Sequence, residues 1–373
     1  MPTLHDPVTI GNLHLKNRIL MAPMTRGRAT REHVPTPMMA AYYAERASAG
    51  LIIAEATDIS AAAKGYSLTP GVHTPAQIAG WRKVTDAVHA AGGRIFLQIW
   101  HCGRMSHPDL HGGARTVAPS EVTFPGQIWL AGADGKGGMV DCPVPRALDI
   151  DEIPPIVADF RQAALNAIEA GFDGVEIHAA NSYLIDQFLR STSNRRDDAY
   201  GGSRENRLRF LFEVVDAVTE AIGAARTGVR LSPRNRARGM DCPDSLPTAL
   251  EAAARLHQRG VAYLHFNEPE ENPPSPEADT FRRDLRAAFP GPVIVAGGYT
   301  AARAAAVLEQ GQADLVAFGR PFIANPDLPA RLARGWPLNP PEPATFFGGD
   351  ATGYTTYPDR KSTRLNSSHL GIS

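Results

Sequence analysis

The sequence predicts a single closed barrel of eight parallel strands surrounded by helices, an α/β fold of the (β/α)8 type. Short apolar segments alternate with longer segments in which apolar residues recur at helical spacing, and this unit repeats eight times along the chain. Near-continuous apolar strands between amphipathic helices are typical of a parallel sheet covered by helices. Eight such units favour a closed barrel over an open sheet. A length of 373 residues accommodates one large domain of this kind.

Each repeating unit begins with a short apolar strand. The predicted strands are Ile19–Met21, Leu51–Ala54, Ile95–Ile99, Gly174–Ile177, Val229–Ser232, Ala262–Phe266, Val293–Ala296 and Leu315–Phe318. The helical segments between them include Thr36–Ser48, Pro75–Ala91, Glu152–Ala170, Ser203–Ile222, Ser245–Arg259 and Thr300–Gln310. Pro75 suits the first turn of its helix, and Asp244 immediately precedes another predicted helix start.

Two segments fall outside the repeating pattern. Residues 4–18 contain Gly11-Asn12 between short alternating runs, so we expect a hairpin that plugs the bottom of the barrel. Residues 101–150 are rich in Gly and Pro, lack helical periodicity and follow a strand end. A connection of this length in a compact domain is usually functional or disordered, and its position predicts a lid over an active site.

The domain prediction covers residues 1–358, followed by a tail at 359–373. Lys361–Ser373 has neither periodicity nor an apolar run, so we interpret it as a disordered segment of foreign origin, outside the fold.

Composition narrows the functional classes. Lys plus Arg (38) balances Asp plus Glu (39), which gives no electrostatic reason to expect nucleic acid or an anionic membrane as partner. The N-terminal residues lack the organisation of a signal peptide, and no apolar run is long enough to span a bilayer, so a cytoplasmic protein is expected. Three separated cysteines cannot supply the four thiolates of an iron–sulfur cluster.

A candidate catalytic group follows the fourth predicted strand. The run Val175-Glu176-Ile177 ends in His178, with Asn181 three residues later and Tyr183 two beyond that. The carboxyl ends of barrel strands are where active sites form. A His and an Asn there can both donate hydrogen bonds to one substrate oxygen, and a Tyr hydroxyl can supply a proton.

Neighbouring motifs extend this pattern into a family resemblance. They include Asp173–His178, Asp186–Leu189, Ser193–Arg196, Tyr200–Arg207, Met21–Arg26, Leu97–His101, Gly228–Pro233, Ala296–Tyr299 and Ala317–Arg320. In this order, from about Thr3 to Pro358, the chain resembles the Old Yellow Enzyme family of flavin-dependent ene-reductases, in its bacterial N-ethylmaleimide-reductase-like branch.

The residues themselves favour a phosphate site at the end of the barrel. No G-x-G-x-x-G motif lies between a strand and a helix, so a Rossmann dinucleotide site is unsupported. The loops after the seventh and eighth strands, which commonly bind phosphate in such barrels, contain Gly298 and Gly319-Arg320. Glycines let backbone N–H groups approach an anion, and the arginine adds charge.

The resemblance implies that the cofactor is non-covalent FMN and that NADPH or NADH is the reductant. Gln98 would hydrogen-bond the pyrimidine edge of the flavin, and Arg230 would lie beside N1 and O2, where its charge stabilises the reduced flavin. Thr25 would donate to flavin O4. Backbone contacts would come from Pro23, Met24 and Ala56.

By the same resemblance, the activated C=C bond of an α,β-unsaturated carbonyl or nitro compound would be reduced in two half-reactions. His178 and Asn181 would bind the substrate oxygen and Tyr183 would protonate the α-carbon, while Tyr66 and Trp100 would line the substrate pocket. Phe347 stands where relatives usually have a pocket tyrosine. We expect small electrophilic alkenes as partners and a monomer or small homo-oligomer.

Two other functional classes remain open from the sequence. One is a cofactor-free barrel lyase or isomerase with His178 as its base, because a fold does not by itself fix a function. The other is a barrel that binds ligands without catalysis. No strand-end lysine supports a Schiff-base aldolase, and no strand-end carboxylate cluster predicts a metal site. The basic segment at 234–238 follows the fifth strand, and we interpret it as a solvated loop.

Overall fold

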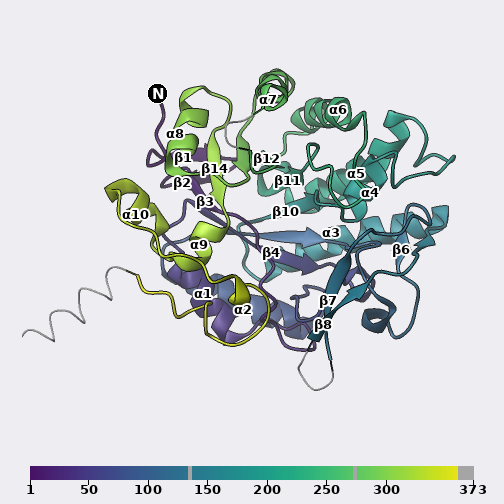
Figure 1. Cartoon of the computed structure of the whole chain (residues 1–373), viewed down its shortest axis with the longest axis horizontal. Coiled ribbons are helices and arrows are strands. Elements are labelled where there is room, and N and C mark those ends of the chain that lie inside the picture. Colours follow the sequence, from purple (N-terminus) through teal and green to yellow (C-terminus); the bar gives the residue numbers. More distant parts are fainter. Residues whose placement is uncertain (133–136, 272–274, 360–373) are drawn as a thin grey trace, which may run out of the picture.

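The computed structural model describes residues 1–132, 137–271 and 275–359, in which helices surround a central barrel (Figure 1). Within these residues eight parallel strands follow chain order around the barrel, and the last pairs with the first. The predicted fold class is confirmed. The barrel strands are β3 (Ile19–Met21), β4 (Leu51–Asp58), β5 (Ile95–Trp100), β10 (Gly174–Ala179), β11 (Thr227–Leu231), β12 (Tyr263–Asn267), β13 (Val293–Ala296) and β14 (Leu315–Phe318).

Most helices begin and end within a few residues of their predicted bounds. The helices are α1 (Pro37–Glu45), α2 (Pro75–Ala90), α3 (Ile153–Glu169), α4 (Leu184–Leu189), α5 (Arg204–Ile222), α6 (Ser245–Gln258), α7 (Pro276–Ala288), α8 (Ala301–Glu309), α9 (Arg320–Ala324) and α10 (Leu328–Arg334). Helix α2 begins at Pro75 behind a capping box formed by Thr74 and Gln77. Helices α4, α7, α9 and α10 were not among the predicted segments.

Five of the eight strand predictions differ from the observed bounds by one to four residues, and the differences at β11 and β4 have clear backbone reasons. Strand β11 begins earlier than expected, at Thr227, because Thr227 and Gly228 pair with the neighbouring strands although neither is apolar. Strand β4 continues to Asp58, past the predicted end at Ala54. An irregularity between Ala54 and Thr57 shifts its register against β5 and lets the strand continue through buried polar residues.

Side chains alternate between two apolar cores along the barrel strands. Residues such as Leu20, Phe96 and Ile294 pack inside the barrel, whereas their neighbours Ile19 and Leu97 pack with residues of the surrounding helices. This alternation follows from the two-residue period of a strand. The interior core also contains Ile10 and Leu15 from the N-terminal segment.

The N-terminal segment forms the predicted hairpin, with β1 (Val8–Ile10) antiparallel to β2 (Leu13–Leu15). Gly11 turns with a φ of 53°, and a Cβ there would meet the carbonyl oxygen of Ala225, just before β11, at 2.0 Å. Because the hairpin contacts the residues that precede barrel strands, it closes the amino-terminal end. The carboxyl ends of the strands lie at the opposite end of the barrel.

The 101–150 segment carries more structure than its sequence indicates. It contains a parallel pair, β6 (Val117–Ala118) with β9 (Arg146–Ala147), and an antiparallel hairpin, β7 (Gln127–Ala131) with β8 (Gly137–Asp141). Phe124 and Ile128 from this segment pack with Trp100 and Tyr183 at the carboxyl end of the barrel. The segment therefore lies where the predicted lid was expected.

The predicted foreign tail lies outside the described residues apart from Asp359, and the domain boundary at residue 358 remains a prediction. Across the described parts of the chain, no helix has both the length and the apolar character needed to cross a membrane.

Candidate active site

A cavity of about 850 Å³ lies at the carboxyl ends of β3, β13 and β14. Its volume is in the range of small-molecule and cofactor sites. It brings together eight of the residues singled out from the sequence. They are Pro23, Met24, Thr25, Arg230, Gly298, Gly319, Arg320 and Phe347.

The glycine loop after β13 has a backbone that other residues rarely adopt. Gly297 and Gly298 have φ of 137° and 62°, and a Cβ on Gly297 would meet the carbonyl oxygen of Glu268 at 2.4 Å. Below the loop, buried Glu268 accepts hydrogen bonds from Arg282 at 2.6 and 2.8 Å and from the Tyr299 hydroxyl at 2.7 Å. The loop is thereby fixed with little side-chain bulk over the cavity, as phosphate binding requires.

Arg320 lies at the mouth of this cavity with about half of its side chain exposed. It forms an ion pair with Glu270, which also lines the cavity. A phosphate bound to Arg320 therefore has to compete with a carboxylate of the chain itself. The charge expected from the sequence is present, but it is screened by solvent and already paired.

Arg230 is a buried cation that lines the cavity. One of its terminal nitrogens donates to Asn267 Oδ1 at 3.2 Å, while its Nε is buried without a partner among the described residues. Burial lowers the pKa of Arg230, with an opposing effect from Glu176, but a guanidinium stays charged at any ordinary pH. An unsatisfied buried donor beside a cavity fits the electron-rich N1 and O2 edge of a flavin.

Gln98 lies inside the barrel on β5, and only strand β10 separates it from Arg230 on β11. Its Nε2 donates to Glu176 Oε1 at 2.7 Å, and both side chains are fully buried. Gln98 and Glu176 are direct partners across β5 and β10, and His178 and Arg230 are direct partners across β10 and β11. Strand β10 thus joins the proposed flavin contacts to the proposed substrate contacts.

The turn that follows β10 is held in an unusual conformation. Asn181 and Ser182 have φ of 57° and 73°, which non-glycine residues seldom adopt. The Asn181 N–H donates to Ser232 Oγ at 2.7 Å, and the Ser182 N–H donates to Asp186 Oδ2 at 2.9 Å. Backbone strain of this kind persists only where the surroundings impose it, and it is common at active sites.

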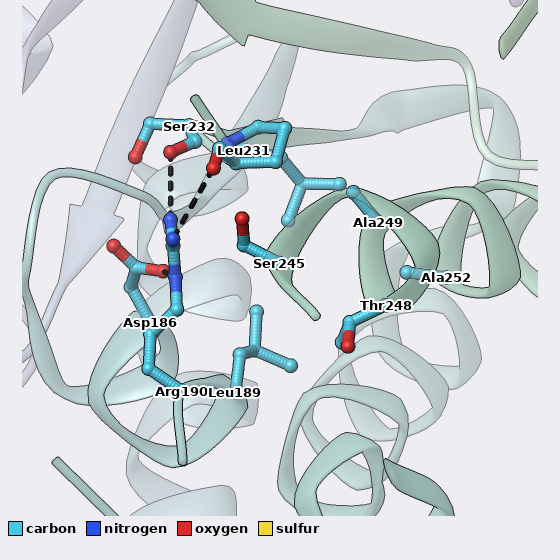
Figure 2. A pocket seen from close by; sticks show the side chains of 10 residues that line it. Asp186, Leu189, Arg190, Leu231, Ser232, Ser245, Thr248, Ala249 and Ala252 are labelled. Carbon is cyan, nitrogen blue, oxygen red and sulfur yellow. Dashed lines mark hydrogen bonds and ion pairs between the residues drawn. The ribbon is translucent and has the colours of Figure 1, made fainter. Parts of the chain in front are cut away.

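A buried arginine braces this turn (Figure 2). Arg190 pairs with Asp186 at 2.8 Å and donates to the carbonyl oxygens of Ser232 and Pro233 at 2.7 and 3.2 Å. A cavity of only about 10 Å³ lies beside it, against α6, which is about the space of one water molecule. The region shown in Figure 2 therefore supports the turn after β10, and its cavity is too small for a cofactor or an alkene.

Asn181 is connected to the large cavity by a hydrogen bond to Asn267, a residue that was not predicted from the sequence. Its Oδ1 accepts from Asn267 Nδ2 at 2.9 Å, while Asn267 Oδ1 accepts from Arg230. Because the Oδ1 atom of Asn181 is occupied by this bond, its Nδ2 group is the part of the side-chain amide that remains free to donate to another group. Asn181 is thereby oriented as a donor, as the role expected for it from the sequence requires.

An aromatic wall surrounds Tyr183. Its ring lies edge-on to Trp100 and His178, with centroid distances of 4.5 and 4.8 Å, and Tyr66 stacks on Trp100 at 5.7 Å. The hydroxyls of Tyr66 and Tyr183 are 3.2 Å apart. Trp100 is fixed by its Nε1, which donates to buried Asp58 at 2.8 Å. Ala56 packs in the same cluster, and the backbone contact to flavin expected for it stays a prediction.

Burial sets the protonation states of the proposed catalytic pair. It lowers the pKa of His178 well below the ordinary value, with further contributions from Arg230 and His265, so the imidazole is neutral. Its Nδ1 is buried with no partner in the described structure. Burial, together with Tyr66, raises the pKa of Tyr183 well above its ordinary value, so this hydroxyl keeps its proton. Both side chains are therefore neutral and can donate hydrogen bonds.

Comparison with known proteins agrees with this geometry. A profile described as the NADH:flavin oxidoreductase / NADH oxidase family matches residues 3–339. The chain belongs to this family. It is 46% identical to a chanoclavine-I aldehyde reductase of Penicillium roqueforti, covering 96% of both chains. It is 44% identical to a probable flavin mononucleotide-dependent alkene reductase of Leishmania infantum, covering 94% of this chain and 96% of that relative.

Two solved structures extend the comparison. Morphinone reductase has a TM-score of 0.94 and 50% identity over 97% of each chain. The old yellow enzyme homologue of Zymomonas mobilis has a TM-score of 0.90 and 44% identity over 96% of this chain and 99% of that one. This flavin oxidoreductase is therefore an FMN-dependent ene-reductase of the Old Yellow Enzyme type that uses NAD(P)H as its reductant. A cofactor-free lyase or isomerase is not favoured.

Proposed function

We propose that the flavin ring lies between Gln98 and Arg230, with its phosphate at Gly298, Gly319 and Arg320, and that the alkene binds between the ring and His178, Asn181 and Tyr183. The single observation that carries this proposal is the alignment of His178 beside Arg230 on paired strands, next to the 850 Å³ cavity. The cofactor is proposed to be held without a covalent bond.

His178 and Asn181 would donate hydrogen bonds to the carbonyl or nitro oxygen of the substrate. These bonds strengthen as negative charge develops on that oxygen, and they draw electron density from the alkene. When bound, FMN supplies the hydride that NAD(P)H delivers to it and that the β-carbon of the alkene receives. The proton for the α-carbon would come from the Tyr183 hydroxyl, so that one hydride and one proton complete the reduction.

Tyr66, Trp100 and Phe347 would set the shape of the substrate pocket. The hydroxyl of Tyr66 contacts that of Tyr183, which helps to aim the proton donor. Phe347 lines the cavity with 69% of its surface exposed and has no hydroxyl to offer a substrate. Apolar rather than hydrogen-bonding substrate groups are therefore expected on that side.

The decisive experiment separates the two half-reactions by stopped-flow spectroscopy. Tyr183→Phe removes the proton donor, so it should slow the reduction of cyclohexenone while leaving flavin reduction by NAD(P)H nearly unchanged. Nitroalkenes should be less affected, because their reduced nitronate is stable before it is protonated. His178→Ala removes an oxyanion donor and should slow alkene reduction by about 10²–10³-fold while also weakening substrate binding.

Tyr200→Phe is the matched control for Tyr183→Phe. It also removes a tyrosine hydroxyl, but that hydroxyl donates to Glu213 on α5, away from the site. Both half-reactions should proceed at normal rates in this variant. Equal slowing of flavin reduction and alkene reduction in Tyr183→Phe would contradict the role assigned to Tyr183.

A further inference from the structure

A buried carboxylate occupies the barrel interior beside the proposed flavin contacts. Glu176 on β10 is fully buried and accepts three hydrogen bonds from side chains. The donors are Gln98 Nε2 at 2.7 Å, the Tyr263 hydroxyl at 3.1 Å and His265 Nδ1 at 2.8 Å. The sequence by itself predicts no role for this residue. A charged group in a barrel interior is costly unless it is fully paired, which makes its position informative.

The hydrogen bonds keep Glu176 ionised. Burial by itself would raise the pKa of Glu176, but His265, Arg230 and Gln98 together hold that pKa below its ordinary value. Burial lowers the pKa of His265, so the imidazole is neutral and gives its one N–H, on Nδ1, to the carboxylate. The Nε2 of His265 then carries a lone pair, consistent with its lack of a partner among the described residues.

An ionised carboxylate fixes the orientation of the Gln98 amide. A carboxylate oxygen only accepts hydrogen bonds, so the NH₂ end of Gln98 has to face Glu176. The amide oxygen of Gln98 is then left as an acceptor for another group. The pyrimidine edge of a flavin has one matching donor, N3–H, between its two carbonyl oxygens.

The same carboxylate places a negative charge beside Arg230. Glu176 is paired across the barrel wall with Gly228, two residues before Arg230 on β11, and its charge acts on Arg230. Arg230 stabilises the negative charge of a reduced flavin, and a fixed negative charge nearby opposes that effect.

We infer that Glu176 has two functions toward the cofactor: it orients Gln98 to accept from flavin N3–H, and its charge lowers the reduction potential of the bound flavin. Glu176 is thus a positioning and tuning residue and does not contact substrate. The inference rests on the proposed placement of the flavin pyrimidine between Gln98 and Arg230.

The effect of the Glu176 charge on the flavin is tested by measuring the reduction potential of the FMN-loaded enzyme. Glu176→Gln keeps the size of the side chain and removes its charge, so the equilibrium should shift at least tenfold toward reduced flavin. For a two-electron couple this is an increase of about 30 mV. Tyr263→Phe is the matched control, because it removes one hydrogen bond to Glu176 and keeps the charge. A Glu176→Gln potential equal to those of the wild type and Tyr263→Phe would overturn the tuning role.

The orientation of Gln98 is tested on the wild-type protein, so a folding defect in Glu176→Gln cannot hide the result. FMN and 3-methyl-FMN compete for flavin-depleted protein, and the analogue lacks N3–H. The wild type should prefer FMN at least tenfold, and Gln98→Ala should lose most of that preference. Equal affinity of the wild type for both flavins would overturn the orienting role. Failure to bind either flavin would instead contradict the proposed cofactor site.

Discussion

Hydrogen bonds connect Arg230 through Asn267 to Asn181, and the direction of each bond predicts how substitutions of Asn267 affect alkene reduction. Arg230 donates to Asn267 Oδ1, and Asn267 Nδ2 donates to Asn181 Oδ1. Asn267 therefore turns the Nδ2 group of Asn181 outward as a donor. Replacing Asn267 changes how a neighbouring residue faces the substrate without removing any group proposed to contact that substrate.

Two substitutions at this position should differ in a specific order. Asn267→Ala removes the bond that orients Asn181, at a cost of about 0.5–1.5 kcal/mol, which slows alkene reduction roughly 2- to 13-fold. Asn267→Asp offers only acceptors, so the Asn181 amide should reverse and donate to Asp while its oxygen faces the substrate oxygen. An oxyanion donor is then lost, at a cost of about 2.7–4 kcal/mol, or roughly 10²–10³-fold.

The assay is the oxidative half-reaction with cyclohexenone in stopped flow, with Asn181→Ala as the reference for complete loss of the donor. Asn267→Asp should approach that reference, and Asn267→Ala should stay well above it. The new carboxylate also lies beside Arg230, where it would make the reduced flavin a stronger reductant and so act in the opposite direction. An Asn267→Asp enzyme as fast as Asn267→Ala would refute the proposed orientation of Asn181.

Three other predictions follow from the structure and the sequence. Arg320→Ala should weaken FMN binding by an amount near the lower end of about 1.5–3 kcal/mol, because this arginine is half exposed. Glu270→Gln should strengthen FMN binding, because it removes the carboxylate that competes for Arg320. Equilibrium dialysis measures both affinities, and unchanged affinity in both variants would contradict a phosphate at Arg320. Burial lowers the pKa of His101 to about 3 and also lowers the pKa values of His178 and His265, so below about pH 6.5 the unfolded chain takes up protons that the folded chain does not. Above about pH 6.5 these three groups should not affect the free energy of unfolding, and below about pH 6.5 they should lower it by up to about 4 kcal/mol per pH unit. Urea midpoints that stay constant from pH 7 to pH 5 would rule this out. Deleting Lys361–Ser373 should leave flavin content and melting temperature as they are, and a loss of either would show that the segment belongs to the native protein.

The fold could be predicted because parallel barrel strands are buried on both faces and appear as apolar runs in the sequence. The bounds of β3, β13 and β14 agree with their predictions. The extension of β4 was missed because Glu55, Thr57 and Asp58 are polar, although all three are buried. Helix α7 has few apolar residues along its length, so its sequence shows little of the apolar recurrence that predicts a helix.

The candidate site could be predicted in its motifs but not in its supporting contacts. His178, Asn181 and Tyr183 follow one strand end closely, so their grouping was visible in the sequence. Asn267 and Glu176 act through partners that are 86 and 78 residues distant along the chain, and only the closed barrel brings these partners together. Asn267 is a polar residue at the end of β12, next to strand β11. That position in the sequence is the signal by which it could have been predicted.

Strand β10 presents alternate residues to the two sides of the barrel wall, with Glu176 and His178 on one side and Val175 and Ile177 in the core against the helices. One inserted or deleted residue before Glu176 would exchange these two sets, because side chains alternate along a strand. The carboxylate proposed to tune the flavin and the proposed substrate donor would be lost in the same event. Strand β10 can therefore accept replacements of single side chains more readily than any change in its length.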